Sequence, residues 1–301
     1  MKKTLSLILL MFAVLLALTC PACVQVVPDG SQSVSDGITG QSAVALVAHG
    51  ELETVVFSTA NAESSDAILL RTENCNIMID TSSKEGFARV REYFSVQEIT
   101  SVDCLIITHF DKDHIGGASD LLSLYEVGQV IMPGYEKQSK RYDQMTAAMN
   151  ERAIEPLILT DRLSLLFDDA EFTLYPPERD FYGQDNDNDF SVITSVAHGE
   201  NRLLFMGDAE GPRTLEYLKS GDIAHDFLKA PHHGKFEAEY AELFERVCPL
   251  CAVITDGADQ PADERTLELL RATGAEIYKT TGGTLSIKSD GNELTVMQSV
   301  Y

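Results

Sequence analysis

Short apolar runs recur along most of the chain, and amphipathic segments separate them. The run VDCLIIT at 102–108 is almost wholly apolar, as expected for a strand buried on both faces. The segment EGFARVREYF at 85–94 places Phe87, Val90 and Phe94 on one side, which is the spacing of an amphipathic helix. The alternation of the two patterns predicts an α/β domain.

The same patterns predict an intermixed order of strands and helices along the rest of the sequence. Strands are predicted at 54–58, 66–72, 75–80, 102–108, 127–133, 156–166, 170–175, 226–231, 251–256, 276–279, 284–288 and 293–298, with a two-stranded hairpin at 190–208. Helices are predicted at 85–94, 118–125, 137–151, 211–219, 236–246 and between Asp263 and Gly274. Hairpins and crossovers both occur, and this mixture predicts mixed sheets covered by helices.

The first residues have the pattern of an export signal. Lys2 and Lys3 form a positive start, an apolar run follows at 5–18, and small residues come next. The run is short for a membrane span, so removal of residues 1–22 is favoured over an uncleaved anchor. We therefore expect an extracytoplasmic protein that is either secreted or held at the outer face of the cell membrane.

Two cysteines at the end of this signal offer a second way to reach the membrane surface. A lipid on Cys20 or Cys23 would anchor the chain, although the residues before each cysteine fit a lipoprotein signal only loosely. A polar linker is predicted at 23–51, and it leads into one folded domain at 52–301. The length allows a single sizeable α/β domain of this kind.

The composition is strongly acidic. The formal net charge is −24 at pH 7, and loss of the signal makes it more negative because the signal holds Lys2 and Lys3 but no acid. Such a surface repels polyanions at long range, and the chain has no basic run, so we expect no stable nucleic-acid complex. A local metal site can still bind one phosphate, because bound cations invert the local charge. No protein partner is predicted.

The cysteines beyond the signal do not form a metal-binding pattern. Cys75 and Cys104 lie in apolar strand-like runs and are expected in the core. Cys248 and Cys251 have CxxC spacing, which an exported protein could oxidise. Since no second CxxC accompanies them, a structural zinc site is not expected, and the simpler interpretation is two buried cysteines entering a strand.

The strongest chemical signal follows the buried strand at 102–108. The loop THFDKDHIGG carries His109, Asp111, Asp113 and His114, and two glycines end it. Ligands of α/β folds commonly bind at the carboxyl ends of strands. Alternation cannot place all four side chains around one ion, but it can supply two adjacent metals. The two glycines are expected to let the backbone pass close to the metals and turn into the next helix.

Two further strand ends carry metal-type ligands. Asp208 follows Gly207 after an apolar strand, although such turns are common, and His232 and His233 follow the strand DFLKA. Taken alone, each could be a surface feature. The remaining histidines are assigned no function; they are His49, His198 and His225.

Together, the three strand ends predict a dinuclear hydrolytic centre. Two metals bridged by a carboxylate can lower the pKa of a bound water to about 7 and supply a hydroxide nucleophile. The donor set contains several carboxylates beside imidazoles, which makes it harder than an all-histidine site. Two divalent ions, Zn²⁺ or Mn²⁺, are therefore expected.

The order HxDxDH, then GD, then HHG resembles the metallo-β-lactamase superfamily. With FLKAPHHG, NDFS and LLFMGDAE, the sequence is most similar to the ComEC-like branch, which is the soluble hydrolase domain of competence proteins, over roughly residues 52–298. The resemblance implies an αββα sandwich, a four-layer α/β fold of the metallo-β-lactamase type. The usual third position of the first motif is histidine, and here it is Asp111.

The resemblance also implies roles for individual residues. His109 and Asp111 would hold the first metal, Asp113 and His114 the second, and Asp208 would bridge them. His233 is favoured over His232 as the last ligand of the second metal. The remaining catalytic or substrate-contacting residues are Asp113, His232, Asn188 and Ser191. The superfamily's usual middle histidine is absent, so the first metal is expected to be weakly held or to bind only with substrate.

The sequence thus favours an exported metal-dependent hydrolase, a phosphodiesterase or nuclease that uses a metal-activated hydroxide. The substrate would be a small phosphodiester, a phosphorylated envelope component or DNA. One alternative is hydrolysis of carboxylic esters, lactones or β-lactams, which the replaced histidines disfavour. The other is a non-catalytic binding module on the same fold.

Overall fold

The computed structural model describes residues 24–26, 49–58, 63–183, 186–220 and 223–299. The predicted signal at 1–22 and most of the predicted linker lie outside these residues. Within the described part, no helix combines the length and the apolar character that crossing a membrane would require.

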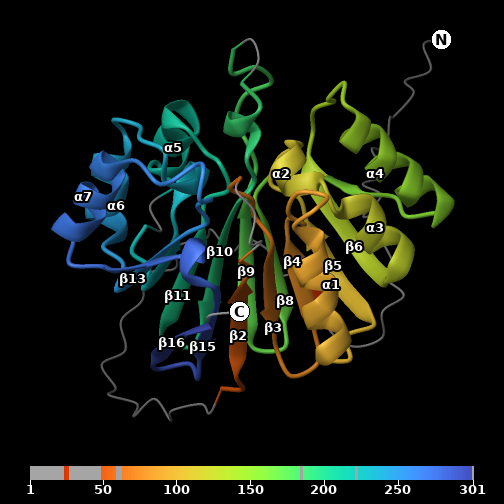
Figure 1. Cartoon of the computed structure of the whole chain (residues 1–301), viewed down its shortest axis with the longest axis horizontal. Helices are drawn as coiled ribbons and strands as arrows, with labels where there is room; N and C mark the ends of the chain where they lie inside the picture. Colours follow the sequence, from red (N-terminus) through yellow and green to blue (C-terminus); the bar gives the residue numbers. More distant parts are fainter. Residues whose placement is uncertain (1–23, 27–48, 59–62, 184–185, 221–222, 300–301) are drawn as a thin grey trace, which may run out of the picture.

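The described residues form two eight-stranded sheets packed face to face, with helices on the outer face of each (Figure 1). This confirms the predicted αββα sandwich. Helices α1, α3 and α4 cover one sheet, and α5, α6 and α7 cover the other. Apolar side chains of both sheets, such as Ile77 and Phe172, meet in a central core between them. Strands buried on both faces explain the continuous apolar runs in the sequence.

The first sheet has the order β16-β15-β2-β3-β4-β5-β6-β7. Its strands are β2 (Leu52–Val56), β3 (Ile68–Arg71), β4 (Asn76–Ile79), β5 (Ser101–Ile106), β6 (Glu126–Pro133), β7 (Leu157–Leu159), β15 (Thr284–Ser289) and β16 (Leu294–Ser299). The strands from β4 to β7 are parallel, and the others pair antiparallel.

The second sheet has the order β1-β8-β9-β10-β11-β12-β13-β14. Its strands are β1 (Val24–Val26), β8 (Leu163–Phe167), β9 (Ala170–Tyr175), β10 (Ile193–His198), β11 (Asn201–Phe205), β12 (Phe227–Lys229), β13 (Cys251–Ile254) and β14 (Glu276–Lys279). Strands β11 to β14 are parallel. Strand β1 pairs antiparallel with β8, so a piece of the predicted linker is an edge strand.

The helices lie close to the predicted ranges. They are α1 (Phe87–Val96), α2 (Lys112–Ile115), α3 (Ala118–Leu124), α4 (Lys140–Glu151), α5 (Gly211–Tyr217), α6 (Tyr240–Val247) and α7 (Glu264–Ala272). Three 3₁₀ turns accompany them, η1 (Asn188–Phe190), η2 (Pro231–Gly234) and η3 (Thr280–Gly282). Helix α2 and these turns were not predicted, because one turn of helix shows no periodicity. The predicted cap Asp263 accepts a hydrogen bond from the backbone N–H of Arg265.

The cysteine predictions are confirmed in part. Cys75 and Cys104 are buried in the core and form no disulfide. Cys251 is also buried, at the start of β13, whereas Cys248 is exposed. The prediction of two buried cysteines is therefore wrong for Cys248, because it ends α6 in a left-handed conformation instead of entering the strand.

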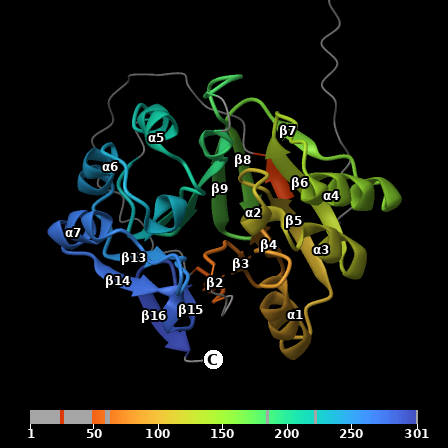
Figure 2. The same cartoon turned by 45° about the horizontal axis from the view of Figure 1, so that its top comes forward.

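The parallel strands of both sheets end at the same end of the sandwich. Strands β4 and β5 of the first sheet and β11, β12 and β13 of the second all direct their carboxyl ends there. Helix α2 lies at this end, which Figure 2 turns toward the viewer. The loops after these strands carry the predicted metal ligands, so the fold brings together residues that lie far apart in the sequence.

Candidate metal centre

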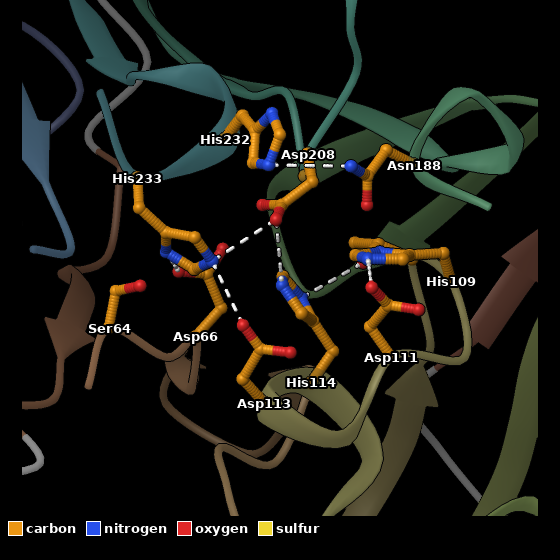
Figure 3. Close-up of polar contacts among 12 residues, drawn as sticks. Ser64, Asp66, His109, Asp111, Asp113, His114, Asn188, Asp208, His232 and His233 are labelled. Atoms are coloured by element: carbon orange, nitrogen blue, oxygen red, sulfur yellow. Dashed lines mark hydrogen bonds and ion pairs between the residues drawn. The ribbon is translucent and has the colours of Figure 1, made fainter. Parts of the chain in front are cut away.

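Four predicted ligands meet between the two sheets (Figure 3). Asp113 and His114 come from α2, Asp208 follows β11, and His233 lies in η2. One ligand atom from each lies within 4.8 Å of the others. We call this group the four-ligand cluster; it is the set predicted for the second metal together with the predicted bridge.

The spacing of the donor atoms matches that of a metal shell. Oδ2 of Asp208 lies 3.2 Å from Nε2 of His114 and 3.1 Å from Nε2 of His233. Nε2 of His233 also lies 3.4 Å from Oδ2 of Asp113. Bonds of about 2.0–2.1 Å at tetrahedral angles place ligand atoms roughly 3.3 Å apart. The four-ligand cluster therefore already has the edge lengths of such a shell.

Hydrogen bonds decide which imidazole nitrogen faces the centre. Nδ1 of His114 lies 2.7 Å from Oδ2 of Asp80 and donates to it. Nδ1 of His233 lies 3.1 Å from the carbonyl oxygen of Thr255, and Nδ1 of His109 lies 3.0 Å from the hydroxyl of Thr108. Because these partners hold a proton on each Nδ1, Nε2 is the nitrogen that faces the centre and that could bind a metal ion.

These three Nε2 atoms test whether the site suits a metal. Within the described residues, Nε2 of His109, His114 and His233 are all buried and have no hydrogen-bond partner, and neither has Oδ1 of Asp208. Buried polar atoms are normally satisfied, so several unsatisfied donor atoms around one space call for a common partner. Imidazoles and carboxylates of this kind fit a divalent cation.

The charges of the buried carboxylates also indicate a site for a cation. Burial alone would raise the pKa of Asp208, but the charges of His233 and His114 hold it well below its ordinary value. Burial likewise opposes a charge on His114, yet Asp208 and Asp80 raise its pKa well above 6.5. The carboxylates thus create a negative potential strong enough to hold protons on buried imidazoles. A divalent cation would satisfy the same potential.

A buried lysine balances part of this charge. Lys229, at the end of β12, is fully buried; its Nζ makes an ion pair with Asp66 and lies 3.7 Å from Oδ1 of Asp208. It also donates to the carbonyl oxygen of Gly207 at 3.2 Å. Asp66 lies 3.3 Å from Nδ1 of His233. Lys229 therefore links the loop that carries Asp208 to Asp66, the acid that lies beside His233.

Unusual backbone conformations aim the ligands. His232 and His233 have φ of 48° and 52°, in the left-handed region that non-glycine residues rarely occupy. Such conformations persist where the surrounding structure requires them, and they cluster at functional sites. Gly207 has φ of 56°, and a Cβ there would lie 2.9 Å from Oγ of Ser191. No other residue type would fit this turn without strain.

The two glycines after His114 have a different function from the one predicted. A Cβ on Gly116 would lie 2.4 Å from the backbone N of Lys84, and one on Gly117 would lie 2.5 Å from the ring of Phe87. Their φ values are ordinary helical ones, −58° and −89°. They allow α2 and α3 to pack closely against the β4–α1 segment, and they do not bring backbone to the metals.

The predicted first-metal ligands are less completely arranged. We call them the His109–Asp111 pair. Nε2 of His109 lies 3.9 Å from Oδ2 of Asp111, and His109 is fully buried. Asp111 makes an ion pair with Lys137, which also lies 2.6 Å from Oδ2 of Asp187. The lysine ammonium therefore pairs with Oδ1 of Asp111, whereas Oδ2 is the oxygen that lies toward His109.

The predicted substrate residues divide between two positions. Asn188 lines a pocket beside the centre together with Asp111, Lys137 and Asp187, and we call this pocket the mouth. Its Nδ2 lies 3.3 Å from Nε2 of His232 and donates to Glu210 at 2.8 Å. Ser191 is fully buried, and its Oγ accepts the backbone N–H of Asp208 at 3.0 Å. Its position differs from the predicted substrate contact, because it holds the backbone of Asp208 in place from within the core.

The ring of His232 lies beside Asp208 and is directed toward Asn188 (Figure 3). Burial lowers the pKa of His232 to about 4. Its Nε2 lies 2.7 Å from Nζ of Lys235, and its Nδ1 lies 3.3 Å from Oε1 of Glu210. The neutral ring therefore accepts a hydrogen bond from Lys235. This leaves His233, as favoured from the sequence, as the histidine that joins Asp208.

Several supporting residues were not predicted. Asp80 follows β4 as the ligands follow their strands, so an acid at a strand end is a signal that could have found it. Asp66 precedes β3 and gives no such signal. Asp187 lies in a polar stretch, and Thr108 and Thr255 are single residues at strand ends. Their functions depend on hydrogen bonds that only the folded chain forms.

Comparison with known proteins places this site in a familiar context. The sequence model of the metallo-beta-lactamase superfamily matches residues 60–247. The chain is 27% identical over 194 residues to ComE operon protein 3 of Bacillus subtilis, covering 62% of this chain and 24% of that protein. It is 28% identical over 200 residues to Recombination protein 2 of Haemophilus influenzae, covering 65% of this chain and 23% of that protein.

Further matches extend the same picture. Competence protein ComA of Neisseria gonorrhoeae is 24% identical, over 71% of this chain and 29% of that protein. The chain thus spans about a quarter of the length of these curated relatives. A solved structure, the metallo-beta-lactamase fold protein YhfI of Bacillus subtilis, aligns with a TM-score of 0.53 and 10% identity. It covers 82% of this chain and 100% of that one, which shows a common fold.

Proposed function

The chain belongs to the metallo-beta-lactamase superfamily, and from this premise we propose that it is an exported hydrolase of phosphodiesters that uses two divalent ions, Zn²⁺ or Mn²⁺. The observation that carries the proposal is the four-ligand cluster, in which Asp208 lies 3.1–3.2 Å from two imidazole nitrogens. When bound, such ions lower the pKa of water and polarise the oxygens of the substrate.

The protein's own residues hold and orient this chemistry. His114 and His233 present Nε2, because Asp80 and Thr255 hold their Nδ1 atoms. Asp208, held by Ser191 from behind, would bridge the two ions. His109 and Asp111 would help to hold the first ion, which would bind weakly or only together with substrate because the usual middle histidine is absent. Asp113 would complete the set of residues that hold the second ion.

The mouth of the centre supports an anionic substrate. Lys235 and Lys137 flank the mouth, each within hydrogen-bond distance of a site residue, His232 and Asp187 respectively. The overall surface is acidic, with a net charge of −24, so these local cations stand out. A phosphodiester oxygen could accept from Lys235 and Asn188 beside His232 as charge develops on it. The neutral His232 would position these donors.

The acidic charge of the chain limits which phosphodiesters are expected as substrates. A processive nuclease needs a continuous basic track, and the chain has no basic run. A small phosphodiester or a phosphorylated envelope component fits better. Similarity to proteins named for competence and recombination keeps single-stranded DNA among the substrates to test. Export is supported by the N-terminal pattern of Lys2, Lys3 and the apolar run at 5–18.

One experiment separates the candidate reactions. The full chain would be stripped of metal, reloaded with Mn²⁺ or Zn²⁺, and assayed on bis-p-nitrophenyl phosphate, single-stranded DNA and a chromogenic β-lactam. Asp208→Asn, which keeps the shape and removes the bridging charge, is the inactive control. Asp120→Asn, at a partly exposed acid of α3 that makes an ion pair with Lys84, is the matched active control.

Cleavage of the phosphodiester by the parent and by Asp120→Asn, but not by Asp208→Asn, is the expected result. Cleavage of the β-lactam alone would replace the proposal with the alternative hydrolase. A chain that binds no metal and cleaves nothing would support the non-catalytic binding module. The DNA assay decides whether nuclease is the right description.

A further inference from the structure

A second group of metal-type ligands lies at the far end of the sandwich. It consists of His49 just before β2, Asp169 in the β8–β9 turn and His198 at the end of β10. Strand β10 starts near Ser191 behind the metal centre and ends at His198, so this group and the centre lie at opposite ends of one strand. Neither histidine was assigned a function from the sequence.

The donor atoms have the spacing found in the four-ligand cluster. Nδ1 of His49 lies 3.2 Å from Oδ2 of Asp169, and Nε2 of His198 lies 3.4 Å from Oδ1 of the same carboxylate. One ligand atom from each residue lies within 4.8 Å of the others. Tetrahedral zinc with bonds of about 2.0–2.1 Å separates its ligand atoms by roughly 3.3 Å. The three side chains therefore outline one face of a zinc shell.

The orientation of His198 makes its Nε2 available. The ring is fully buried, and its Nδ1 lies 2.7 Å from Oγ of Ser289, which Asn201 also holds at 2.8 Å. Within the described residues, Nε2 is a buried atom without a hydrogen-bond partner, and it is directed toward Asp169. Because Oγ of Ser289 also accepts the N–H groups of Asn201 and Gly291, its hydroxyl donates to Nδ1 in the metal-free ring, and Nε2 carries the ring proton toward Asp169. A metal on Nε2 would move this proton to Nδ1 and reverse the hydrogen bond to Ser289.

The other two ligands are held but remain reachable. Asp169 accepts the backbone N–H of Gly50 at 2.8 Å. Burial alone would raise the pKa of Asp169, but this hydrogen bond and the charge of His198 keep it below the ordinary value, so the carboxylate is ionised. The side chains of His49 and Asp169 are 23% and 35% exposed. Solvent can therefore supply the fourth ligand, and an ion can enter.

From this geometry we propose that His49, Asp169 and His198 bind a zinc ion, separate from the proposed dinuclear centre. Two imidazoles and one carboxylate suit zinc better than the hard cations Mg²⁺ and Ca²⁺. The ion would fasten the segment just before β2 of the first sheet to two turns of the second sheet. It would thus clamp both sheets at the end away from the catalytic chemistry.

Metal counting tests this proposal on the full chain. The parent, His49→Gln, Asp169→Asn and Asp168→Asn would be stripped, reloaded with Zn²⁺, desalted and measured by elemental analysis. Asp168 is the matched control, since it neighbours Asp169 in the same turn but bonds to Thr72 and Asn74 instead. We expect His49→Gln and Asp169→Asn each to bind one zinc fewer than the parent, and Asp168→Asn to bind the same number.

The same count in a chain with a disabled main centre removes any contribution from the catalytic ions. Asp208→Asn with His233→Gln should still bind one zinc, and addition of Asp169→Asn should abolish it. Zinc should raise the Tm of the first chain and leave that of the second unchanged. The proposal is overturned if His49→Gln and Asp169→Asn bind as much zinc as the parent, or if the disabled chain binds none.

Discussion

The two halves of the candidate metal centre differ in how completely their ligands are buried and held by hydrogen bonds. In the four-ligand cluster, His114 and His233 are buried and their Nδ1 atoms are bonded to Asp80 and Thr255. The His109–Asp111 pair has one buried imidazole and one partly exposed carboxylate that is paired with a lysine. The difference teaches that one half is preorganised for an ion, whereas the other must rearrange to hold one.

Preorganisation of this kind should appear as a difference in affinity. Ligands that are already placed lose little entropy on binding, and outer hydrogen bonds typically contribute 10–100-fold to metal affinity. We therefore expect one tightly bound ion and one weakly bound ion. A substrate oxygen would fill the place of the missing middle histidine, so substrate should strengthen the weak site.

Loss of the proposed bridge should have the largest effect, because Asp208 is proposed to bind both ions. Asp208→Asn should lower kcat/KM for a phosphodiester by at least about 10³-fold, which corresponds to about 4 kcal/mol of lost transition-state stabilisation. Steady-state kinetics and metal counting would measure this, with Asp120→Asn as control. Near-parent activity in Asp208→Asn would remove the basis for treating the halves as one centre.

The charge balance of the four-ligand cluster predicts a comparable effect on stability. Lys229→Met would leave Asp66 and Asp208 buried without their cation. We expect the metal-free chain to lose about 3–5 kcal/mol of unfolding free energy, measured by urea denaturation. Lys219→Met, an exposed lysine, is the control. A change in Lys229→Met no larger than in Lys219→Met would show that the cluster needs no internal cation.

A smaller effect should follow from loosening one imidazole. Asp80→Asn keeps the volume of the side chain but removes the negative charge of the carboxylate that accepts a hydrogen bond from Nδ1 of His114. The affinity for the tightly bound ion should fall about 10–100-fold, while that of the weak ion changes less. Calorimetric titration of the metal-free chain distinguishes the two ions. Equal losses at both would contradict the difference between the halves.

The sequence indicates candidate ligands for a physical reason. A buried strand is recognisable as an apolar run, and a histidine or aspartate directly after such a run has few structural reasons to be there. His109, Asp208 and His233 all follow this rule. The same apolar runs predict most of the strands along the chain, and the family resemblance that the motifs carry implies the αββα sandwich that the structure confirms. The ligand assignments themselves stay predictions until metal is measured.

What the sequence does not predict depends on contacts between distant segments. Asp66 and Lys229 lie far apart in the chain, and nothing in either segment indicates an ion pair. His49, Asp169 and His198 likewise meet only because three loops converge. Ser191 was expected at the substrate, yet tertiary packing places it behind Asp208. Supporting residues are therefore harder to predict than ligands, since their partners are chosen by the fold.

The smallest predicted effect tests the weak half directly. Lys137 pairs with both Asp111 and Asp187, so it competes with an ion for the Asp111 carboxylate. Because this pair is partly exposed, the competition amounts to about 1 kcal/mol or less. Lys137→Gln should therefore strengthen the weaker metal site a few-fold and leave the tight one unchanged. Lys140→Gln, at the exposed start of α4, is the control.

Metal titration without substrate is the appropriate measurement, because Lys137 is also expected to attract a phosphodiester. The two effects oppose each other in a kinetic assay: removal of Lys137 should tighten the ion but raise KM for an anionic substrate. Tighter binding of the weak ion together with a raised KM would assign both functions to this lysine. Unchanged metal affinity would mean that the His109–Asp111 pair is limited by its missing third ligand alone.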